Sequence, residues 1–434
     1  MKARKVLVFP AGTEIGLEIH QALQHCKEVE LFGAGQAVSN HAPFVYERYY
    51  QLPSIHEENW LSALVELCNS LEIEYIFPAY DDLIVALAKH REDIPAIVLT
   101  ATNEVCRITR SKSRTYQALC SVVRVPRTQN PANATGFPLF VKPDCGQGSQ
   151  GAQQVCNASE LLTAVASIND PIVCEYLPGE EYTIDCFSDR ERGVLFCGAR
   201  VRIRMRNGIA VHTKTVSLDG VKEIAEAIHK VLGMRGAWFF QLKRAREGEL
   251  TLLEVAPRIA GSMSTHRVQG INFPLLTIFE HERLPLQLMT NPLPVELDRS
   301  LQNQYRLGLI YEALYIDLDD TLLVRNKVNL DAMRLVFSCI NRKIPVILIT
   351  RHESDLSATL ASHRLASLFD EVIHLDRKQL KSEHVRHRNA IFLDDSFAER
   401  YDVQQKLGIP TFDCSMIDAL ISTHPLETLE GSES

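Results

Sequence analysis

Short apolar runs alternate with amphipathic stretches along the first hundred residues. The apolar runs lie at residues 5–10, 29–34 and 75–78, and the stretches with helical spacing lie at residues 17–25 and 60–71. Such runs are typical of buried strands, and such spacing is typical of helices packed against them. A turn with Gly12 and Gly16 joins the first strand to the first helix, but the dinucleotide-binding glycine fingerprint is absent. The pattern predicts a small, parallel, doubly wound α/β domain over residues 1–100.

Strands dominate the next two hundred residues, and their turns predict antiparallel pairs. Strands are expected at residues 137–143, 172–176, 182–187, 198–205, 209–216, 238–242 and 250–255, with helices at 103–121 and 160–166. The turns at 206–208 and 246–249 each join two neighbouring strands as a hairpin. We expect an α+β domain over residues 101–300, another α/β domain over residues 311–425, and a frayed tail over residues 426–434.

Two polar residues interrupt the apolar hairpin of residues 238–255. Gln241 and Glu254 each place an oxygen ligand in a strand that is otherwise apolar. A buried carboxylate is costly unless it is paired or holds a metal ion, and Mg²⁺ binds oxygen ligands that it shares with phosphates. The alternative is an edge hairpin on which both side chains face water. From this hairpin alone both alternatives stay open.

A glycine-rich loop follows the strand that contains Lys142. Residues 144–151 read DCGQGSQG, and loops of this kind let backbone N–H groups approach phosphates closely. Lys142 adds a point charge beside the loop, and Lys112 lies on the preceding helix. A glycine-rich hairpin turn would give the same pattern, and the loop is not a Walker A sequence.

Composition and charge exclude several classes of protein. A net charge of −8 with no clustered basic segment argues against a nucleic acid partner. The densest basic run, residues 200–206, alternates arginine with apolar residues, so Arg200, Arg202, Arg204 and Lys214 would bind an anionic substrate or be solvated strand charges. The 11 cysteines have no zinc-binding spacing, and we recognise neither a signal peptide nor a membrane-spanning run. We expect a cytoplasmic protein with no membrane partner.

Taken in order, these motifs resemble those of the ATP-grasp superfamily, in particular its carbamoyl-phosphate-synthetase and biotin-carboxylase type. The resemblance covers residues 1–300 and implies a Rossmann-like pre-ATP-grasp domain, then an ATP-grasp domain whose lid spans residues 122–185. The motifs are Lys112, Lys142-Pro143, the glycine loop, E-Y-L-x-G-x-E-Y-T-x-D from Glu175 to Asp185, Gln241, and Glu254-Val-Ala-Pro-Arg258.

The resemblance assigns a role to each matching residue. Lys112, Lys142, Gly148 and Ser149 would bind the phosphates of ATP; Glu175, Leu177, Glu181 and His212 would contact the rest of the nucleotide; Gln241 and Glu254 would hold Mg²⁺; and Arg258 would face an acyl phosphate. Family members often have asparagine as a third metal ligand two residues after the glutamate, where this chain has Ala256. One or two metal ions therefore stay open. The implied chemistry is phosphorylation of a carboxylate by ATP, followed by displacement of phosphate by an amine.

Carboxylates gather at predicted strand ends of the C-terminal domain. Apolar strands lead into Asp317, Asp319 and Asp320, into Thr350, and into Asp394 and Asp395. Parallel α/β sheets bind ligands at the carboxyl ends of their strands, and crowded carboxylates suit a hard cation. An aspartate can also attack phosphorus and form an aspartyl phosphate.

The D-x-D-D-T motif and the later Thr and Asp-Asp resemble the haloacid-dehalogenase (HAD) superfamily of phosphohydrolases over residues 311–425. The resemblance implies that Asp317 is the nucleophile, Asp319 the general acid/base, and Thr350 and Lys381 phosphoryl-binding groups, with Lys378 as the alternative lysine. Mg²⁺ would be held by Asp317, Asp319, Asp394 and Asp395. The spacing from Thr321 to Thr350 and on to Lys381 leaves no room for a cap domain, so we expect a capless, open site.

These readings predict a bifunctional enzyme that uses ATP and Mg²⁺. Its ligase part would join a small carboxylate to an amine, and its phosphatase part would hydrolyse a phosphorylated metabolite of the same pathway; a homo-oligomer is a possible assembly. Two alternatives stay open: an ATP-grasp kinase paired with a phosphatase, and a nucleotide-sensing ATP-grasp module that regulates the phosphatase. Ala256 is the residue that keeps the sensing alternative open.

Overall fold

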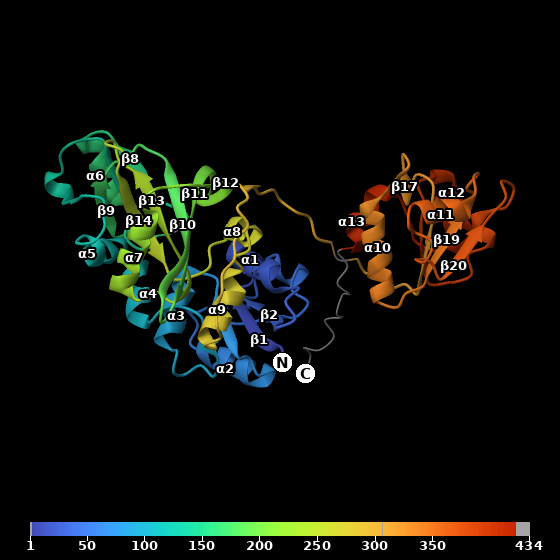
Figure 1. Cartoon of the computed structure of the whole chain (residues 1–434), viewed down its shortest axis with the longest axis horizontal. Coiled ribbons are helices and arrows are strands. Elements are labelled where there is room, and N and C mark those ends of the chain that lie inside the picture. The colour runs from blue at the N-terminus through green and yellow to red at the C-terminus, as the bar shows by residue number, and fades with distance from the viewer. Residues whose placement is uncertain (1, 147, 149, 306, 422–434) are drawn as a thin grey trace. The chain divides into compact units, whose positions relative to one another are not determined.

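A computed structural model describes residues 2–146, 148, 150–305 and 307–421 of the chain. The chain forms two compact units, Met1–Leu301 and Gln302–Ser434 (Figure 1). Ser149 and the tail of residues 426–434 lie outside the described residues, so the predictions made for them stay predictions.

The first unit begins with a five-stranded parallel sheet. Its strands are β1 (Arg4–Phe9), β2 (Val29–Gly35), β3 (Tyr49–Gln51), β4 (Tyr75–Pro78) and β5 (Ile97–Val98), in the order β3-β2-β1-β4-β5. Helices α1 (Glu14–Leu23), α2 (Trp60–Leu71) and α3 (Asp81–Lys89) connect them. The apolar runs of the central strands β1 and β4 are almost completely buried because a parallel sheet covered by helices hides both of its faces.

A six-stranded antiparallel sheet forms the centre of the same unit. Its order is β14-β13-β10-β11-β12-β15, from β10 (Glu181–Asp189), β11 (Gly193–Arg206), β12 (Ile209–Val216), β13 (Gly236–Arg244), β14 (Leu250–Ala256) and β15 (Glu296–Asp298). Helices α7 (Val221–Leu232), α8 (Ser264–Val268) and α9 (Phe273–His281) pack against its strands. The predicted hairpin of β13 and β14 is confirmed, and it places Gln241 directly opposite Glu254.

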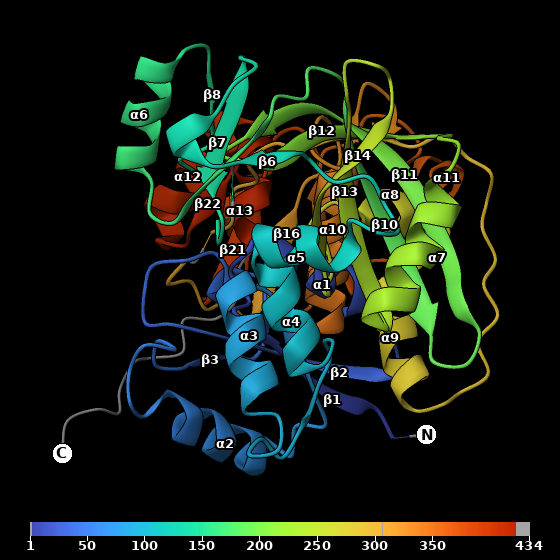
Figure 2. The same cartoon turned by 90° about the vertical axis from the view of Figure 1, so that its left-hand side faces the viewer.

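A four-stranded antiparallel sheet forms the predicted lid region, at the top of the view in Figure 2. It consists of β6 (Thr128–Gln129), β7 (Leu139–Pro143), β8 (Gln153–Val155) and β9 (Pro171–Glu175), with α6 (Ala158–Ser167) against it. Its own small core, built from residues such as Leu139, Val141 and Leu161, is separate from the cores of the larger sheets. This sheet can therefore move as a lid without opening those cores.

One helix predicted over residues 103–121 is two helices, α4 (Asn103–Arg110) and α5 (Lys112–Leu119). Ser111 separates them because its backbone is extended and its hydroxyl accepts a hydrogen bond from the Arg114 amide as the N-cap of α5. The same hydroxyl donates to Asp144 Oδ2 at 2.5 Å. The break fixes the start of α5, and with it Lys112, beside the glycine loop.

The first unit has no core boundary at residue 100. One hydrophobic cluster combines Val6 and Phe77 of the parallel sheet with Phe187 and Phe239 of the antiparallel sheet. Burial of this shared apolar surface holds the two sheets together, so the predicted domains 1–100 and 101–300 pack against each other within one compact unit.

The second unit contains a five-stranded parallel sheet of order β20-β19-β16-β21-β22. Its strands are β16 (Ala313–Ile316), β19 (Val346–Thr350), β20 (Glu371–His374), β21 (Ala390–Leu393) and β22 (Thr411–Phe412), with helices α10 (Leu330–Asn341), α11 (Leu356–Ser362), α12 (Phe397–Leu407) and α13 (Ile417–Ile421). Residues 321–381 are all described, and they hold only a short hairpin of β17 (Leu323–Val324) and β18 (Lys327–Val328), α10, β19, α11 and β20. This segment therefore contains no inserted cap domain.

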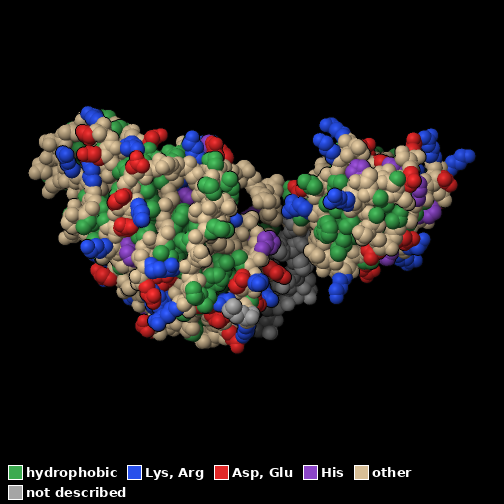
Figure 3. All heavy atoms as spheres, viewed as in Figure 1, with side chains coloured by type: hydrophobic (Ala, Val, Ile, Leu, Met, Phe, Trp, Pro, Cys, Tyr) green, Lys and Arg blue, Asp and Glu red, His purple; other side chains and the backbone are tan. Residues whose placement is uncertain are grey.

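Charge is distributed without a large patch of one sign on the face shown in Figure 3, where basic and acidic side chains are interspersed over each unit. Within the described ranges, every helix is too short or too polar to cross a lipid bilayer.

Candidate functional site

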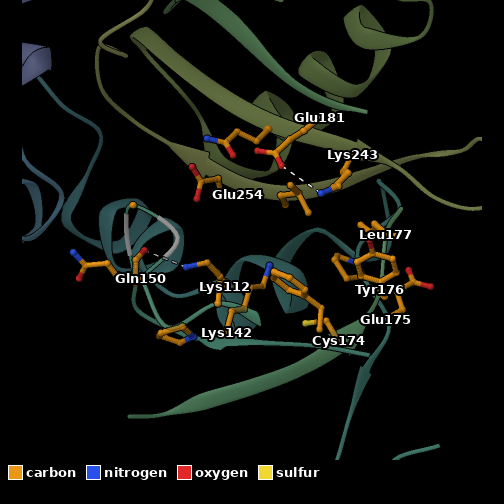
Figure 4. Close-up of a pocket in the computed structure, with 18 residues that line it drawn as sticks. Lys112, Lys142, Gln150, Cys174, Glu175, Tyr176, Leu177, Glu181, Lys243 and Glu254 are labelled. Atoms are coloured by element: carbon orange, nitrogen blue, oxygen red, sulfur yellow. Dashed lines mark hydrogen bonds and ion pairs between the residues drawn. The ribbon is translucent and has the colours of Figure 1, made fainter. Parts of the chain in front are cut away.

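A cavity of about 150 Å³ lies between the antiparallel sheet and the lid (Figure 4). Eight residues predicted to bind the nucleotide or the metal line it: Lys112, Lys142, Gly148, Glu175, Leu177, Glu181, Gln241 and Glu254. Figure 4 shows Glu254 and Glu181 on one wall of the cavity and Lys112 and Lys142 on the opposite wall. The arrangement therefore offers oxygen ligands on one side and ammonium groups on the other.

The acidic wall follows from strand register. Gln241 pairs with Glu254 in β14 and with Thr183 in β10, and directly opposed residues of antiparallel strands project from the same face. Among the described residues, the Glu254 carboxylate has no hydrogen-bond or ion-pair partner, although the side chain is half-buried. An unpaired carboxylate facing a cavity, next to an amide oxygen, is the ligand pair that suits Mg²⁺. The hairpin is at the edge of its sheet, as the alternative has it, but Gln241 and Glu254 line the cavity.

The two lysines of the opposite wall lack a carboxylate partner within the described structure. Lys142 is buried, donates to the Tyr116 hydroxyl at 2.8 Å, and lies over the Tyr116 ring. Burial lowers the pKa of Lys142. Lys112 donates to the carbonyl oxygens of Asp144 and Gly146 in the glycine loop, at 3.3 Å and 3.2 Å. Both ammonium groups are therefore available to an anion that enters the cavity.

The glycine loop contacts the turn between β11 and β12. An added Cβ on Gly208 would lie 2.1 Å from the carbonyl carbon of Gly148, so this approach requires glycine. Gly148 itself has a φ of +63°, in the left-handed region that glycine adopts without strain. Two segments that are separate in the sequence thus meet at Gly148, which lines the cavity.

The remaining acidic side chains of the cavity are already paired. Glu181 lies 3.3 Å from Arg202 and 3.6 Å from Lys243, and Glu175 lies 3.1 Å from Arg124. Glu181 can still accept hydrogen bonds from ribose hydroxyls, because a carboxylate has about four lone-pair sites. Sequence reasoning missed Lys243, whose only signal was its position two residues after Gln241 on the same face of β13.

Two known families match parts of the chain. Residues 167–297 match a family described as ATP-grasp in the biosynthetic pathway with Ter operon, and residues 7–100 match the PylC-like N-terminal domain. A D-alanine–D-alanine ligase from Fusobacterium nucleatum is 29% identical over 165 residues, which cover 34% of this chain and 56% of that protein. A carbamoyl phosphate synthase large chain from Clostridium botulinum is 24% identical, over 59% of this chain and 27% of that protein. The chain thus spans only 56% and 27% of these relatives.

Solved structures resemble the first unit more completely. The biotin carboxylase domain of a 2-oxoglutarate carboxylase from Hydrogenobacter thermophilus, in complex with MgADP, has a TM-score of 0.57 at 17% identity and covers 67% of this chain and 72% of that chain. An L-amino acid ligase from Bacillus licheniformis has a TM-score of 0.53 at 18% identity and covers 64% of this chain and 74% of that chain. The first unit has the ATP-grasp fold. The carboxylase structure contains MgADP, which is what remains of MgATP after transfer of the γ-phosphate. ATP and Mg²⁺ are the cofactors that the sequence predicts.

Arg258 and His212 of the ATP-grasp unit each have an acidic partner that the sequence did not predict. Arg258 is held by Asp81, with Nε and Nη2 at 2.5 Å and 3.2 Å from the carboxylate oxygens. Burial alone would raise the pKa of Asp81, but Arg258 outweighs burial and lowers it. Arg258 also lines a second, smaller cavity together with Lys112 and Glu254. Its guanidinium group faces that cavity while it is paired with Asp81.

The predicted nucleotide contact of His212 is not supported, because His212 is absent from the lining of the nucleotide cavity. Its ring instead lies 2.7 Å from Glu296 and 3.8 Å from Asp298 at the edge strand β15. The reason is a contact between segments that are distant in the sequence. Strand β15 begins eighty residues after the end of β12, pairs with β12, and places Glu296 and Asp298 beside the imidazole ring.

Lys142→Met is expected to weaken MgATP binding by about tenfold or more, since a charge-assisted contact to phosphate is lost. The same change should raise the melting temperature of the nucleotide-free protein, because it removes a buried ammonium that has no carboxylate partner. Calorimetric titration and thermal unfolding measure the two effects, with Lys214→Met on the exposed side of β12 as the control. A lower melting temperature together with unchanged affinity would contradict the assignment.

The second unit brings its predicted carboxylates together at the carboxyl ends of β16 and β21. Carboxylate oxygens of Asp317, Asp394 and Asp395 lie within 4.8 Å of one another. Lys381 Nζ lies 2.8 Å from Asp317 Oδ1 and 2.6 Å from Asp394 Oδ2. Burial, opposed by Lys381 and reinforced by Asp394, raises the pKa of Asp317 to about 6. Two buried carboxylates with raised pKa values, Asp317 and Asp394, beside a third that is exposed fit a divalent cation.

The buried hydroxyl of Thr350 has no hydrogen-bond partner among the described residues. An orphaned hydroxyl at a strand end is suited to donate to an incoming anion. The structure also distinguishes the two candidate lysines, since Lys381 is 3% exposed and contacts the aspartates, whereas Lys378 is exposed.

Asp319 lies apart from the carboxylate cluster, which corrects its prediction as a side-chain metal ligand. Its half-exposed carboxylate lies 2.9 Å from His352 Nδ1, and the other ring nitrogen of His352 lies 2.9 Å from the Thr359 hydroxyl. His352 was missed by sequence reasoning, although its position two residues after Thr350, at the end of a strand, was a usable signal. This histidine orients Asp319 at the open side of the site.

Proposed function

We propose that the ATP-grasp unit is an ATP-dependent ligase that joins a small-molecule carboxylate to an amine. The observation that carries the proposal is the cavity whose walls oppose Gln241 and Glu254 to Lys112 and Lys142. Lys112 and Lys142 would neutralise the phosphates of ATP, and Gln241 and Glu254 would hold Mg²⁺, which supplies charge neutralisation. Ala256 offers no ligand atom, so we propose one protein-held metal position between Gln241 and Glu254.

The proposed reaction has two steps. The acid's carboxylate oxygen forms a bond to the γ-phosphorus as ADP leaves; the amine nitrogen then attacks the acyl carbon, and inorganic phosphate leaves as the amine loses a proton. The ion pair of Arg258 with Asp81 would border the acyl phosphate. The protein contributes mainly positioning and electrostatic stabilisation, which dominate catalysis of phosphoryl transfer.

Product analysis with labelled ATP tests this function. A panel of acids and amines should give ADP, inorganic phosphate and an amide only when both partners are present. A phosphorylated acid formed without any dependence on an amine would identify a kinase and overturn the ligase. Nucleotide binding without turnover would identify a sensing module instead.

We further propose that the second unit is a Mg²⁺-dependent phosphohydrolase of the haloacid-dehalogenase type. The cluster of Asp317, Lys381 and Asp394, with the unpartnered hydroxyl of Thr350, supports it. Asp317 Oδ would attack phosphorus and release the alcohol, with Asp319 donating the proton; water would then hydrolyse the aspartyl phosphate with Asp319 as base.

The two proposals together describe a bifunctional enzyme that acts on one small-molecule pathway. Phosphate release from a panel of phosphomonoesters, with and without Mg²⁺, tests the second activity. Release that requires ATP binding but no ATP hydrolysis would favour the regulatory alternative.

A further inference from the structure

Arg200 lies in a buried charged network of the ATP-grasp unit, away from the nucleotide cavity. Its Nε and Nη2 atoms donate to Asp185 at 2.8 Å and 3.1 Å, and His266 Nδ1 lies 2.9 Å from the same carboxylate. Arg200 and His266 are each 2% exposed, and Asp185 is fully buried. The third guanidinium nitrogen, Nη1, is buried and has no partner among the described residues. A buried donor left unpaired is costly, which marks a place for an acceptor that the chain itself does not supply.

Arg299 directly follows β15, which lies two strands from the strand of Arg200 in the same sheet. Its backbone follows β15, with the amide donating to Val211, and no hydrogen bond or ion pair of its side chain occurs within the described residues. Burial lowers the pKa of Arg299; Glu18 opposes this, and Arg200 is close enough to lower it further. Glu18 is itself engaged by Arg267 at 2.8 Å. Two neighbouring guanidinium groups repel each other, and an anion between them removes the repulsion.

Arg202 and Arg204 of the same strand are engaged through their terminal guanidinium nitrogens. Arg202 pairs with Glu181 and donates to the Gly208 carbonyl, although its inner nitrogen Nε is also buried without a partner among the described residues, and Arg204 pairs with Asp298. Arg200 differs from both because a terminal nitrogen, Nη1, is the one that lacks a partner.

Arg200 lies on the same face of the sheet as Gln241 and Glu254. Glu254, Gln241, Thr183 and Arg200 are successive cross-strand partners, so their side chains project from one face. Three strand spacings place Arg200 about 14 Å from Glu254. Arg299 Nη1 lies 3.3 Å from the point where a Cβ on Gly261 would be, three residues after Arg258. An acid that contacts both the reacting end and the two arginines must span the separation between Glu254 and Arg200, less the lengths of the intervening side chains.

We propose that Arg200 and Arg299 bind a second oxyanion of the acid substrate, a carboxylate or a phosphate at the end remote from the carboxylate that ATP activates. The inference rests on the proposed ligase function and adds a substrate class to it: acids that carry two anionic groups. A planar fork of N–H donors from each arginine matches either oxyanion.

Titration calorimetry of the full chain with MgADP present tests the proposal. The probes are linear monocarboxylates from butyrate to octanoate, the dicarboxylates of equal length, and the pair glycerate and 3-phosphoglycerate. The wild type should bind at least one dianionic acid about tenfold more tightly than its matched monoanion, as one charge-assisted contact predicts. Whether the dicarboxylate or the phosphorylated acid shows the larger preference identifies the oxyanion.

Arg299→Gln is the decisive variant, because the side chain of Arg299 makes no hydrogen bond or ion pair among the described residues and its buried acidic neighbour, Glu18, stays paired with Arg267. The preference for dianions should fall to about twofold or less in Arg299→Gln, recover in part in Arg299→Lys, and persist in Arg204→Gln, a control on the same sheet. No preference in the wild type, or an unchanged preference in Arg299→Gln, would overturn the proposal. Titration with MgADP alone is a separate measurement. An absence of MgADP binding would refute the proposed nucleotide site rather than the oxyanion site.

Discussion

Glu254→Ala is expected to reduce ADP formation by about a hundredfold or more, since it removes the charged ligand of the proposed Mg²⁺ position. The Glu254 carboxylate has no partner among the described residues, so its removal breaks no ion pair and leaves the hairpin of β13 and β14 intact. The variant should therefore fold with a melting temperature close to that of the wild type. Steady-state ADP release and thermal unfolding measure the two expectations.

Glu247→Ala is the matched control for this variant. Glu247 is exposed in the turn that joins the same two strands, so its loss removes an equal charge without touching the cavity. Normal ADP release from Glu254→Ala would refute the metal assignment. A loss that Glu247→Ala shares would mean that hairpin stability, and not metal binding, limits turnover.

Local patterning explains why most of the nucleotide cavity could be predicted. Gln241 and Glu254 belong to one hairpin, and the alternation of strands fixes that both face the same side. Lys142 and Gly148 are likewise placed by one strand and the loop that follows it. Side chains within about twenty residues of each other keep their predicted relative placement in the folded protein, because the turn that joins their strands sets the strand register.

Pairings between distant segments could not be predicted in the same way. Arg258 meets Asp81 across 177 positions of sequence, and His212 meets Glu296 across 84. Nothing in the neighbourhood of either residue indicates its partner. Both ion pairs are tertiary contacts that the local pattern does not encode. The break at Ser111 was also missed, although Ser111 is a local N-cap signal for α5; its hydroxyl in addition donates to Asp144, thirty-three positions later.

The second unit shows the same division. The strand ends at Asp317 and Asp394 follow from apolar runs, whereas the choice of Lys381 over Lys378 depends on which lysine the loop after β20 buries. His352 could have been found from its position just after Thr350. Its contact with Asp319 depends on the packing of α11, which supplies Thr359 to the other side of the ring.

Asp317→Asn is expected to abolish phosphatase turnover, by on the order of a thousandfold or more, while ADP formation continues. The amide cannot attack phosphorus and offers a weaker metal ligand, so both proposed roles are lost. Release of phosphate from the best phosphomonoester of the panel, measured beside ADP formation in the same preparation, separates the two activities. Loss of both would mean that the two sites are coupled or that the variant is misfolded.

Thermal unfolding distinguishes these outcomes. The pKa of Asp317 is raised to about 6 from its usual 3.8, so the folded state binds more protons than the unfolded state. Its ionised form therefore destabilises the metal-free fold above pH 6, and this cost is relieved as pH falls from 6 toward 3.8. Asp317→Asn should melt at a higher temperature than the wild type at pH 7 without Mg²⁺, and the difference should shrink toward pH 4.

Asp320→Asn supplies the control for the same motif. Asp320 is exposed, and its φ of +55° is one that asparagine adopts readily. This variant should retain phosphatase activity and show no pH-dependent gain in stability. A stability gain confined to Asp317→Asn, with turnover lost, would assign both effects to one buried carboxylate; equal loss of turnover in both variants would place the nucleophile elsewhere.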